Sequence, residues 1–394
     1  MLLSRSECVE ILKNVLKQKS TTNDHKEEDV KLLDYNFVRD HTPMGYLGDY
    51  YELTLTYSNA ADGNAKQEKL FIKSLPELSA EAQKEAIFKK EAWLYETLLA
   101  DMQQYSKLKW RANCYFTRSD LLVLENVTLA GYHLSATTEL CETSLFQLMH
   151  SLAAFHSASL IYEQQTEQNI GQEFGHYLQE ITVASEIAWF TTGLSAVLAI
   201  IRSLPEFAAN RDFIDSELLG IMEGIYVQAK PSDRYRNVLC HRDPWAGNIF
   251  FPSQPEQVAL LVDFQTCRYT PPATDLAFSL YMNLSSAERE RLASISLEIY
   301  YNALDANLQE FGLQAEQFLT KSELLKSFEE FRLFGVVYRA VAATIVKVPV
   351  EFVTNDFKYV DRSECLLRYM QENDAFNSYM LECCSEVMEV ALKS

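Results

Sequence analysis

The chain has 394 residues, 48% of them hydrophobic and 23% charged, a composition typical of one bilobal domain or two packed globular domains and not of a disordered or fibrous protein. The formal net charge of −20 disfavours nucleic acid and anionic membranes as main partners, because both require clustered Lys and Arg. The eight cysteines form no C-x-x-C pair, which argues against a zinc site or a disulfide framework and favours a cytoplasmic protein.

The N-terminal third is expected to hold a helix, a linker and a small antiparallel sheet. Charges inside the stretch MLLSRSECVEILKNVLKQ argue against a signal peptide, so we expect an amphipathic helix there and a polar linker over residues 21–29. Segments of alternating apolar and polar residues predict strands, and a helix that Ser79 would cap is expected to end near residue 100. The five expected strands cover residues 35–40, 50–57, 68–76, 114–119 and 121–127.

From about residue 130 the apolar periodicity is mainly helical, with one β interruption near residues 248–263. We therefore expect an α+β, bilobal fold, with a sheet-rich N-terminal lobe over residues 1–127 and a larger, mostly helical lobe over residues 128–394. The longest uncharged run, residues 187–201, is shorter than the roughly 20 residues that cross a bilayer, so we expect a buried helix there. The sequons at Asn126 and Asn283 are expected to carry no glycan.

The segment VLCHRDPWAGNIFF carries the clearest chemical signal. His241, Arg242, Asp243 and Asn248 have the spacing H-R-D-x-x-x-x-N, which is that of a kinase catalytic loop. In such a loop the aspartate accepts or orients the proton of the hydroxyl that receives the phosphate, so Asp243 is the expected catalytic residue. The alternative is a surface turn in which Asp243 precedes Pro244. We expect His241 to be a buried residue that braces the loop rather than an acid or base, a role that Arg242 could share.

Two short apolar strands follow this loop. They are separated by the turn residues 252–257, and the second runs directly into Asp263, Phe264 and Gln265. If the strands form an antiparallel hairpin, its open ends meet, and Asn248 lies beside Asp263. An amide oxygen and a carboxylate are ligands that Mg²⁺ accepts, so both residues are expected metal ligands. The alternative is that they close the hairpin through side-chain to backbone bonds.

A second group of candidate residues lies upstream. Lys73 shares a strand face with Phe71 and Leu75, and its ammonium group needs an anionic partner if that face is buried. Glu91 is the only charge on the apolar stripe of the following helix. We expect the two to pair and to hold Lys73 against the α- and β-phosphates of ATP. The alternative is two solvated residues at the edge of the sheet.

The remaining candidates for nucleotide contact are backbone positions. The strand LLVLENV is expected to enter a hinge, where the backbone of Glu125 to Val127 would bind the adenine edge. Gly45 and Gly48 are candidates for a loop that covers the phosphates, although an ordinary hairpin turn explains them equally well.

In this order, these segments resemble the ecdysteroid kinase-like family, a branch of the aminoglycoside and choline kinase-like group within the protein kinase-like fold. The resemblance covers nearly the whole chain and rests on motifs that include LFIKSLP, FKKEAWLYETLL, LAAFHSAS, LCHRDPWAGNIFF and LLVDFQTCRYTPPATDLAFSLY. It implies phosphorylation of a small molecule by ATP with magnesium, with ecdysteroid hydroxyls as the named substrates and dietary toxins as suspected ones. It transfers the roles above to Lys73, Glu91, Asp243, Asn248 and Asp263.

The chain departs from this family at two loop positions. The family commonly has Gly after the loop histidine and a pair of Asn at the end of the loop, whereas this chain has Arg242 and Gly247. The departures concern loop geometry and leave the metal ligands in place. Asp275 matches a family aspartate that is expected to brace the loop.

The acceptor is expected to be small, because no long segment or A-P-E element separates Asp263 from Asp275 to dock a peptide. We expect a helical insert over residues 162–235 to wall its pocket, with aromatic residues there and near the C-terminus. A protein kinase is one rival reading, and a pseudokinase that binds or scaffolds without transfer is another. Most aromatic residues in these regions are expected to be core residues, and none is singled out among the candidates Phe174, Tyr177, Trp189, Phe190, Phe331 and Tyr338.

Overall fold

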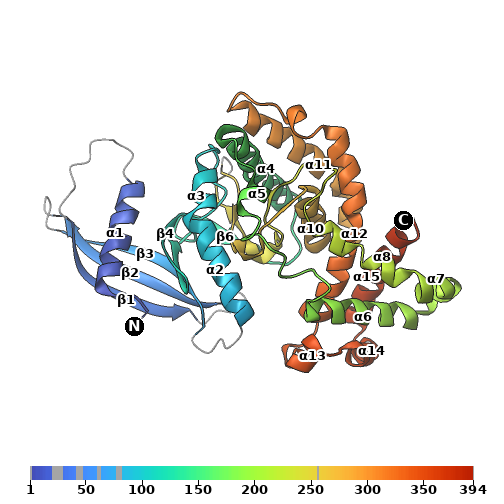
Figure 1. Cartoon of the computed structure of the whole chain (residues 1–394). Helices are drawn as coiled ribbons and strands as arrows, with labels where there is room; N and C mark the ends of the chain where they lie inside the picture. The colour runs from blue at the N-terminus through green and yellow to red at the C-terminus, as the bar shows by residue number, and fades with distance from the viewer. Residues whose placement is uncertain are drawn as a thin grey trace. The chain divides into compact units, whose positions relative to one another are not determined.

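The computed structural model describes residues 2–19, 30–40, 48–59, 64–76, 82–254 and 257–393 (Figure 1). They form two units, which we call the sheet unit and the helical unit. The sheet unit is Met1–Leu134 with Ile249–Gln265, and the helical unit is Ser135–Asn248 with Thr266–Ser394. The division into lobes at residues 127 and 128 stays a prediction, and the expected linker, Gly45 and Ser79 lie outside the described residues.

An antiparallel sheet of five strands, in the order β1-β2-β3-β5-β4, forms the centre of the sheet unit. All five strands correspond to segments that the alternating pattern predicts. Their bounds are β1 Val30–Asp40, β2 Asp49–Asn59, β3 Ala65–Ser74, β4 Cys114–Arg118 and β5 Leu121–Glu125.

The described part of the sheet unit has three helices: α1 (Arg5–Lys19), α2 (Ala82–Glu96) and α3 (Leu98–Gln103). In α1 the buried positions recur three or four residues apart, and they pack on the sheet, as expected of an amphipathic helix (Figure 1). The single helix expected near residues 79–100 corresponds to α2 and the start of α3. The buried residues of α1 are Cys8, Ile11, Leu12 and Val15.

The hairpin expected near residues 248–263 is present in the sheet unit. Strand β8 (Ile249–Pro252) pairs antiparallel with β9 (Leu260–Leu261), and Ile249 lies opposite Leu261. Strand β6 (Tyr132–Leu134), which pairs with the other edge of β8, was not expected from the sequence. A strand of three residues is too short to display an alternating pattern.

Long helices build the helical unit. Helix α4 (Glu142–Thr166) packs against α11 (Ser286–Gln309), and α10 (Ala273–Asn283) packs against α12 (Lys321–Val346) (Figure 1). The unit also has a two-stranded ladder of β7 (Val238–Cys240) and β10 (Arg268–Thr270), which the sequence did not reveal. The remaining helices are α5 Ile170–Phe174, α6 Ala188–Ser203, α7 Arg211–Ser216, α8 Leu218–Met222, α9 Ile225–Gln228, α13 Asn355–Tyr359, α14 Ser363–Glu372 and α15 Asp374–Ala391.

No single helix in the described residues is both long and apolar enough to cross a membrane. One pair, Ala188–Ser203 with Pro205–Ser216, meets the length and composition criteria together but is bent by 96°.

Candidate active site

Lys73 lies at the centre of an ion-pair cluster in the sheet unit. Its Nζ atom is 2.6 Å from Glu91 Oε2 and 2.7 Å from Asp263 Oδ1. The three side chains come from β3, from α2 and from the residues that follow β9, so the fold brings together segments that are distant in sequence. The pairing of Lys73 with Glu91 is the one expected from the sequence, whereas the contact with Asp263 was not anticipated.

The charges in this cluster interact strongly because they are largely shielded from water. Lys73 is 5% exposed and Glu91 is 1% exposed. Burial alone would lower the pKa of Lys73, but the charges of Asp263 and Glu91 raise it above its ordinary value. Burial raises the pKa of Glu91 to about 7 even though Lys73 acts to lower it. Lys73 therefore stays charged at every physiological pH.

Asp263 has a backbone conformation that suits a functional position. Its φ is 69°, in the left-handed region that residues other than glycine seldom adopt. While Oδ1 accepts a hydrogen bond from Lys73, Oδ2 accepts one from Gln265 Nε2 at 3.1 Å. Gly48 lies close to Lys73, where an added Cβ atom would be 3.2 Å from Lys73 Cγ. A glycine at position 48 therefore leaves room for the lysine.

The expected adenine-binding backbone is partly engaged within the sheet unit. The amide of Glu125 donates to the carbonyl of Asn113 at 2.8 Å, and the Glu125 carboxylate accepts from Lys109. The carbonyl of Val127 accepts from the amides of Ala130 and Tyr132. Adenine contact by Glu125 and Val127 therefore stays a prediction.

In the helical unit, Asp243 and Asn248 contact each other directly. Asn248 Nδ2 donates to Asp243 Oδ2 at 2.9 Å and to the Asp243 carbonyl at 3.0 Å. The ring of His241 is buried and accepts a hydrogen bond from the Asp243 amide through Nδ1. The loop motif thus fixes the orientation of the Asp243 carboxylate, and His241 braces the loop as expected.

Asp275 braces the same loop from α10. Its carboxylate accepts hydrogen bonds from the amides of His241 at 2.6 Å and Arg242 at 2.7 Å. Burial would raise the pKa of Asp275, but the hydrogen bond from His156 and the neighbouring donors keep it below its usual value. His156 Nδ1 in turn lies 2.9 Å from the Tyr300 hydroxyl, so the brace continues into α11.

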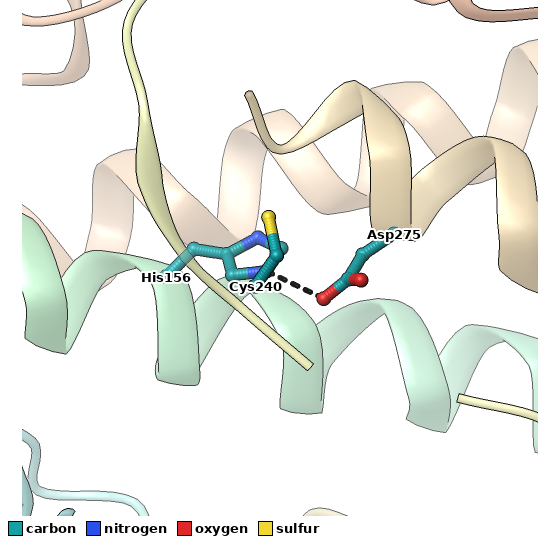
Figure 2. Close-up of side chains that lie close together, drawn as sticks. All are labelled: His156, Cys240 and Asp275. Atoms are coloured by element: carbon teal, nitrogen blue, oxygen red, sulfur yellow. Dashed lines mark hydrogen bonds and ion pairs between the residues drawn. The ribbon is translucent and has the colours of Figure 1, made fainter. Parts of the chain in front are cut away.

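His156, Cys240 and Asp275 lie close together, and Figure 2 shows the first and last joined by a hydrogen bond. Their spacing resembles that of the ligands of a metal site. However, the Cys240 thiol donates to the carbonyls of Thr270 and Pro271, and burial raises its pKa. A protonated thiol is a poor metal ligand. We therefore assign the group to support of the loop. The sequence signal was a lone histidine in the apolar helix LAAFHSAS.

Aromatic rings of the expected acceptor region pack together in the helical unit. Trp189, Phe190 and Phe334 each lie within 6.4 Å of the Tyr338 ring, measured between centroids. The guanidinium carbon of Arg242 lies 4.8 Å from the centre of the Phe334 ring, which stacks on Tyr338, so this cluster lies beside the catalytic loop. Burial raises the pKa of Tyr338, and the charge of Asp243 raises it further. Among the aromatic residues expected from the sequence, Trp189, Phe190 and Tyr338 thus belong to one cluster.

The chain matches the sequence profile of the ecdysteroid kinase-like family over residues 43–313, more than half of its length. The chain belongs to the ecdysteroid kinase-like family. No curated protein matches it. The family, together with the five-stranded sheet and the helical unit, confirms the fold class expected from the sequence, which is an α+β, bilobal, protein kinase-like fold.

The solved structures that this ecdysteroid kinase-like chain matches share little sequence with it. A spectinomycin phosphotransferase crystallised with ADP and spectinomycin is 15% identical, covering 91% of this chain and 94% of its own at a TM-score of 0.43. The choline kinase LicA from Streptococcus pneumoniae is 11% identical, and the match covers 99% of this chain and 100% of LicA at a TM-score of 0.40. An ethanolamine kinase from Plasmodium vivax is 13% identical, and the match covers 78% of this chain and 81% of that kinase at a TM-score of 0.34.

The two departures from the family pattern have local structural reasons. Arg242 has φ 71°, a conformation that glycine adopts without strain and that explains the Gly common in the ecdysteroid kinase-like family. At Gly247 an added Cβ atom would lie 2.3 Å from the Trp245 ring. The position of Trp245 therefore excludes any larger residue at 247 unless the indole moves.

The side chain of Arg242 offsets the strain of its backbone. Arg242 Nη2 lies 3.3 Å from Glu180 Oε2, and its guanidinium carbon lies 4.8 Å from the centre of the Phe334 ring. Burial would raise the pKa of Glu180, but Arg242 and Arg268 lower it to about 2. The sequence did not reveal this contact, because Glu180 lies in the helical insert, 62 residues before Arg242 in the chain.

We expect Arg242→Gly to destabilise the protein by about 1 kcal/mol at pH 7, because the lost charged hydrogen bond outweighs the relieved backbone strain. In the unaltered protein the lowered pKa of Glu180 adds stability above pH 4.5, and this stability is lost as the pH falls toward about 2. The deficit of the variant should therefore shrink mainly below pH 4.5 and be smaller at pH 3 than at pH 7. Urea unfolding of both proteins at the two pH values measures it, and equal stability at pH 7 would contradict the ion pair.

Proposed function

We propose that this chain transfers the γ-phosphate of ATP to a hydroxyl group of a small molecule in the presence of magnesium. The contact of Lys73 with both Glu91 and Asp263 supports the proposal most strongly. A buried lysine between two carboxylates gives the sheet unit one fixed cation, and Lys73 would bind the α- and β-phosphates with it. Glu91 would keep that cation in place.

The residues expected to hold magnesium have suitable donor atoms. Asp263 supplies a carboxylate and Asn248 supplies an amide oxygen, and Mg²⁺ prefers such hard oxygen ligands. Ile249, which follows Asn248, pairs with Leu261, two residues before Asp263, which is the hairpin pairing that the proposed ligand pair requires. Bound magnesium would neutralise charge on the phosphates during transfer.

Asp243 would act on the acceptor. Its carboxylate is oriented by Asn248 Nδ2, and it would accept or orient the proton of the hydroxyl that attacks the γ-phosphate. The proton then leaves the acceptor oxygen as the new phosphate ester bond forms. His241 and Asp275 hold the loop but do not touch the reacting atoms.

The acceptor would be an alcohol with a sizeable apolar body. In the helical unit the partly exposed Trp189 and Tyr338 would offer flat apolar surface, and the fully buried Phe190 and Phe334 pack against Tyr338. Within the ecdysteroid kinase-like family, an ecdysteroid or a hydroxylated dietary compound fits this surface, with phosphorylation as a route of hormone inactivation or detoxification. The free cysteines fit a cytoplasmic protein.

The test incubates the protein with γ-labelled ATP, magnesium and a panel of ecdysteroids and small hydroxylated compounds, together with a generic peptide mixture. We expect a phosphorylated small-molecule product and no labelled peptide. Binding of ATP without a product from any acceptor would contradict the proposal and indicate a pseudokinase. Labelled peptide as the main product would indicate a protein kinase.

A further inference from the structure

Helix α10 carries two buried polar side chains that both face the catalytic loop. Asp275 is near its start and Asn283 is its last residue, and each is 0% exposed. A separation of eight residues spans slightly more than two turns and about 12 Å along a helix, so both lie on one face. The function described above uses Asp275 but gives no role to Asn283.

Asn283 bonds to the loop on both sides of Trp245. Its Oδ1 atom accepts a hydrogen bond from the Ala246 amide at 2.8 Å, and its Nδ2 atom donates to the Pro244 carbonyl at 2.9 Å. Nδ2 also donates to the Ser279 carbonyl within the helix at 3.0 Å, which fixes the amide plane. Only a carboxamide offers an acceptor and two donors in this arrangement, so aspartate, serine or alanine cannot replace it fully.

The two side chains of α10 therefore hold opposite ends of the loop. Asp275 binds the amides of His241 and Arg242, and Asn283 binds Pro244 and Ala246. The four backbone groups belong to buried residues. The two residues between the attachment points that are not buried are Asp243, which is partly exposed, and Trp245, which is 36% exposed.

We propose that Asn283 is a positioning residue, which fixes the second half of the loop and thereby the carboxylate of Asp243. Helix α10 then acts as a rigid template with two attachment points, eight residues apart. The inference rests on the proposed role of Asp243 as the group that accepts the proton. It assigns Asn283, which the sequence presents only as a sequon, to the geometry of the reaction.

Ser279 provides a matched control on the same helix. It is also 0% exposed, and its hydroxyl oxygen has no hydrogen-bond partner among the described residues. Ser279→Ala therefore changes a buried side chain of α10 without removing a contact to the loop. Any general effect of altering this helix should be the same in both variants.

The first readout needs no activity. Hydrogen exchange measured by mass spectrometry over residues 240–250 should be slow in the unaltered protein and about 10- to 100-fold faster in Asn283→Ala, because a buried hydrogen bond is lost at each of two positions. Ser279→Ala should exchange like the unaltered protein. An Ala246 amide that is unprotected in the unaltered protein would overturn the inference even if Asn283→Ala fails to fold.

The second readout separates positioning from folding. When kcat is calculated from the concentration of protein that binds nucleotide, Asn283→Ala should lower it about 10- to 100-fold, with little change in KM for ATP. In an Asp243→Asn background the same substitution should cause almost no further loss, because it acts through Asp243. Losses that multiply would show a purely structural role and overturn the inference. If the unaltered protein phosphorylates no acceptor, the proposed function fails, and hydrogen exchange alone decides whether Asn283 holds the loop.

Discussion

Asp243→Asn should lower kcat by a factor of about 10² to 10⁴, which is the usual contribution of a positioned acid or base. Asparagine has nearly the same size as aspartate, and its side-chain oxygen can still accept a hydrogen bond from Asn248 Nδ2. It cannot take the proton of the acceptor hydroxyl. The loss should therefore appear in the chemical step and not in the fold.

The measurement is steady-state transfer to the acceptor found in the labelled panel, with KM for ATP and the thermal midpoint determined in parallel. Both of these quantities should change little, because Asp243 is partly exposed and binds no phosphate in the proposed scheme. Undiminished kcat in Asp243→Asn would remove Asp243 from the reaction and leave the loop motif without its central role.

Lys73→Ala should destabilise the sheet unit by about 3 to 5 kcal/mol, because it leaves a buried carboxylate without its cation. Glu91 is almost fully buried, and Asp263 would lose the same partner. Burial already raises the pKa of Glu91 to about 7, and removal of Lys73 should raise it further. The destabilisation should therefore decrease as the pH is lowered to about 7 and change little below that pH, because a protonated Glu91 needs no counter-ion.

A double variant separates stability from catalysis. Lys73→Met with Glu91→Leu replaces the buried charges of both residues with apolar side chains of similar volume, and such replacements are often neutral for stability. We expect the double variant to have an unfolding free energy near that of the unaltered protein. Phosphate transfer should be absent, because no cation binds the α- and β-phosphates. Denaturant unfolding and the transfer assay measure the two effects. Activity in the double variant would show that Lys73 is only a structural residue.

Much of the fold could be predicted because its elements carry clear patterns. The five strands of the sheet alternate apolar and polar residues, and α1 has its buried residues three or four positions apart. Strands β6, β7 and β10 were missed because three residues cannot show a period. These strands pair with partners far away in the chain, and a local sequence pattern does not indicate such partners.

The candidate site was predictable where a charge interrupts an apolar face. Glu91 on its apolar stripe pointed to Lys73, and the spacing of the loop motif pointed to Asp243 and Asn248. The bond between Lys73 and Asp263 joins residues 190 positions apart, and nothing near either residue signals the other. Asn283 was equally hidden, because a buried asparagine and a surface sequon look the same in a sequence.

We propose that Asn248 and Asp263 hold one divalent ion at the nucleotide. Binding of Mn²⁺ in the presence of ATP, followed by the electron paramagnetic resonance signal of the free ion, tests it directly for the unaltered protein, Asn248→Ala and Asp263→Ala. We expect each substitution to weaken Mn²⁺ binding at least about tenfold, because each removes an oxygen ligand. Unchanged Mn²⁺ binding in both variants would contradict a shared metal site and with it the proposed reaction.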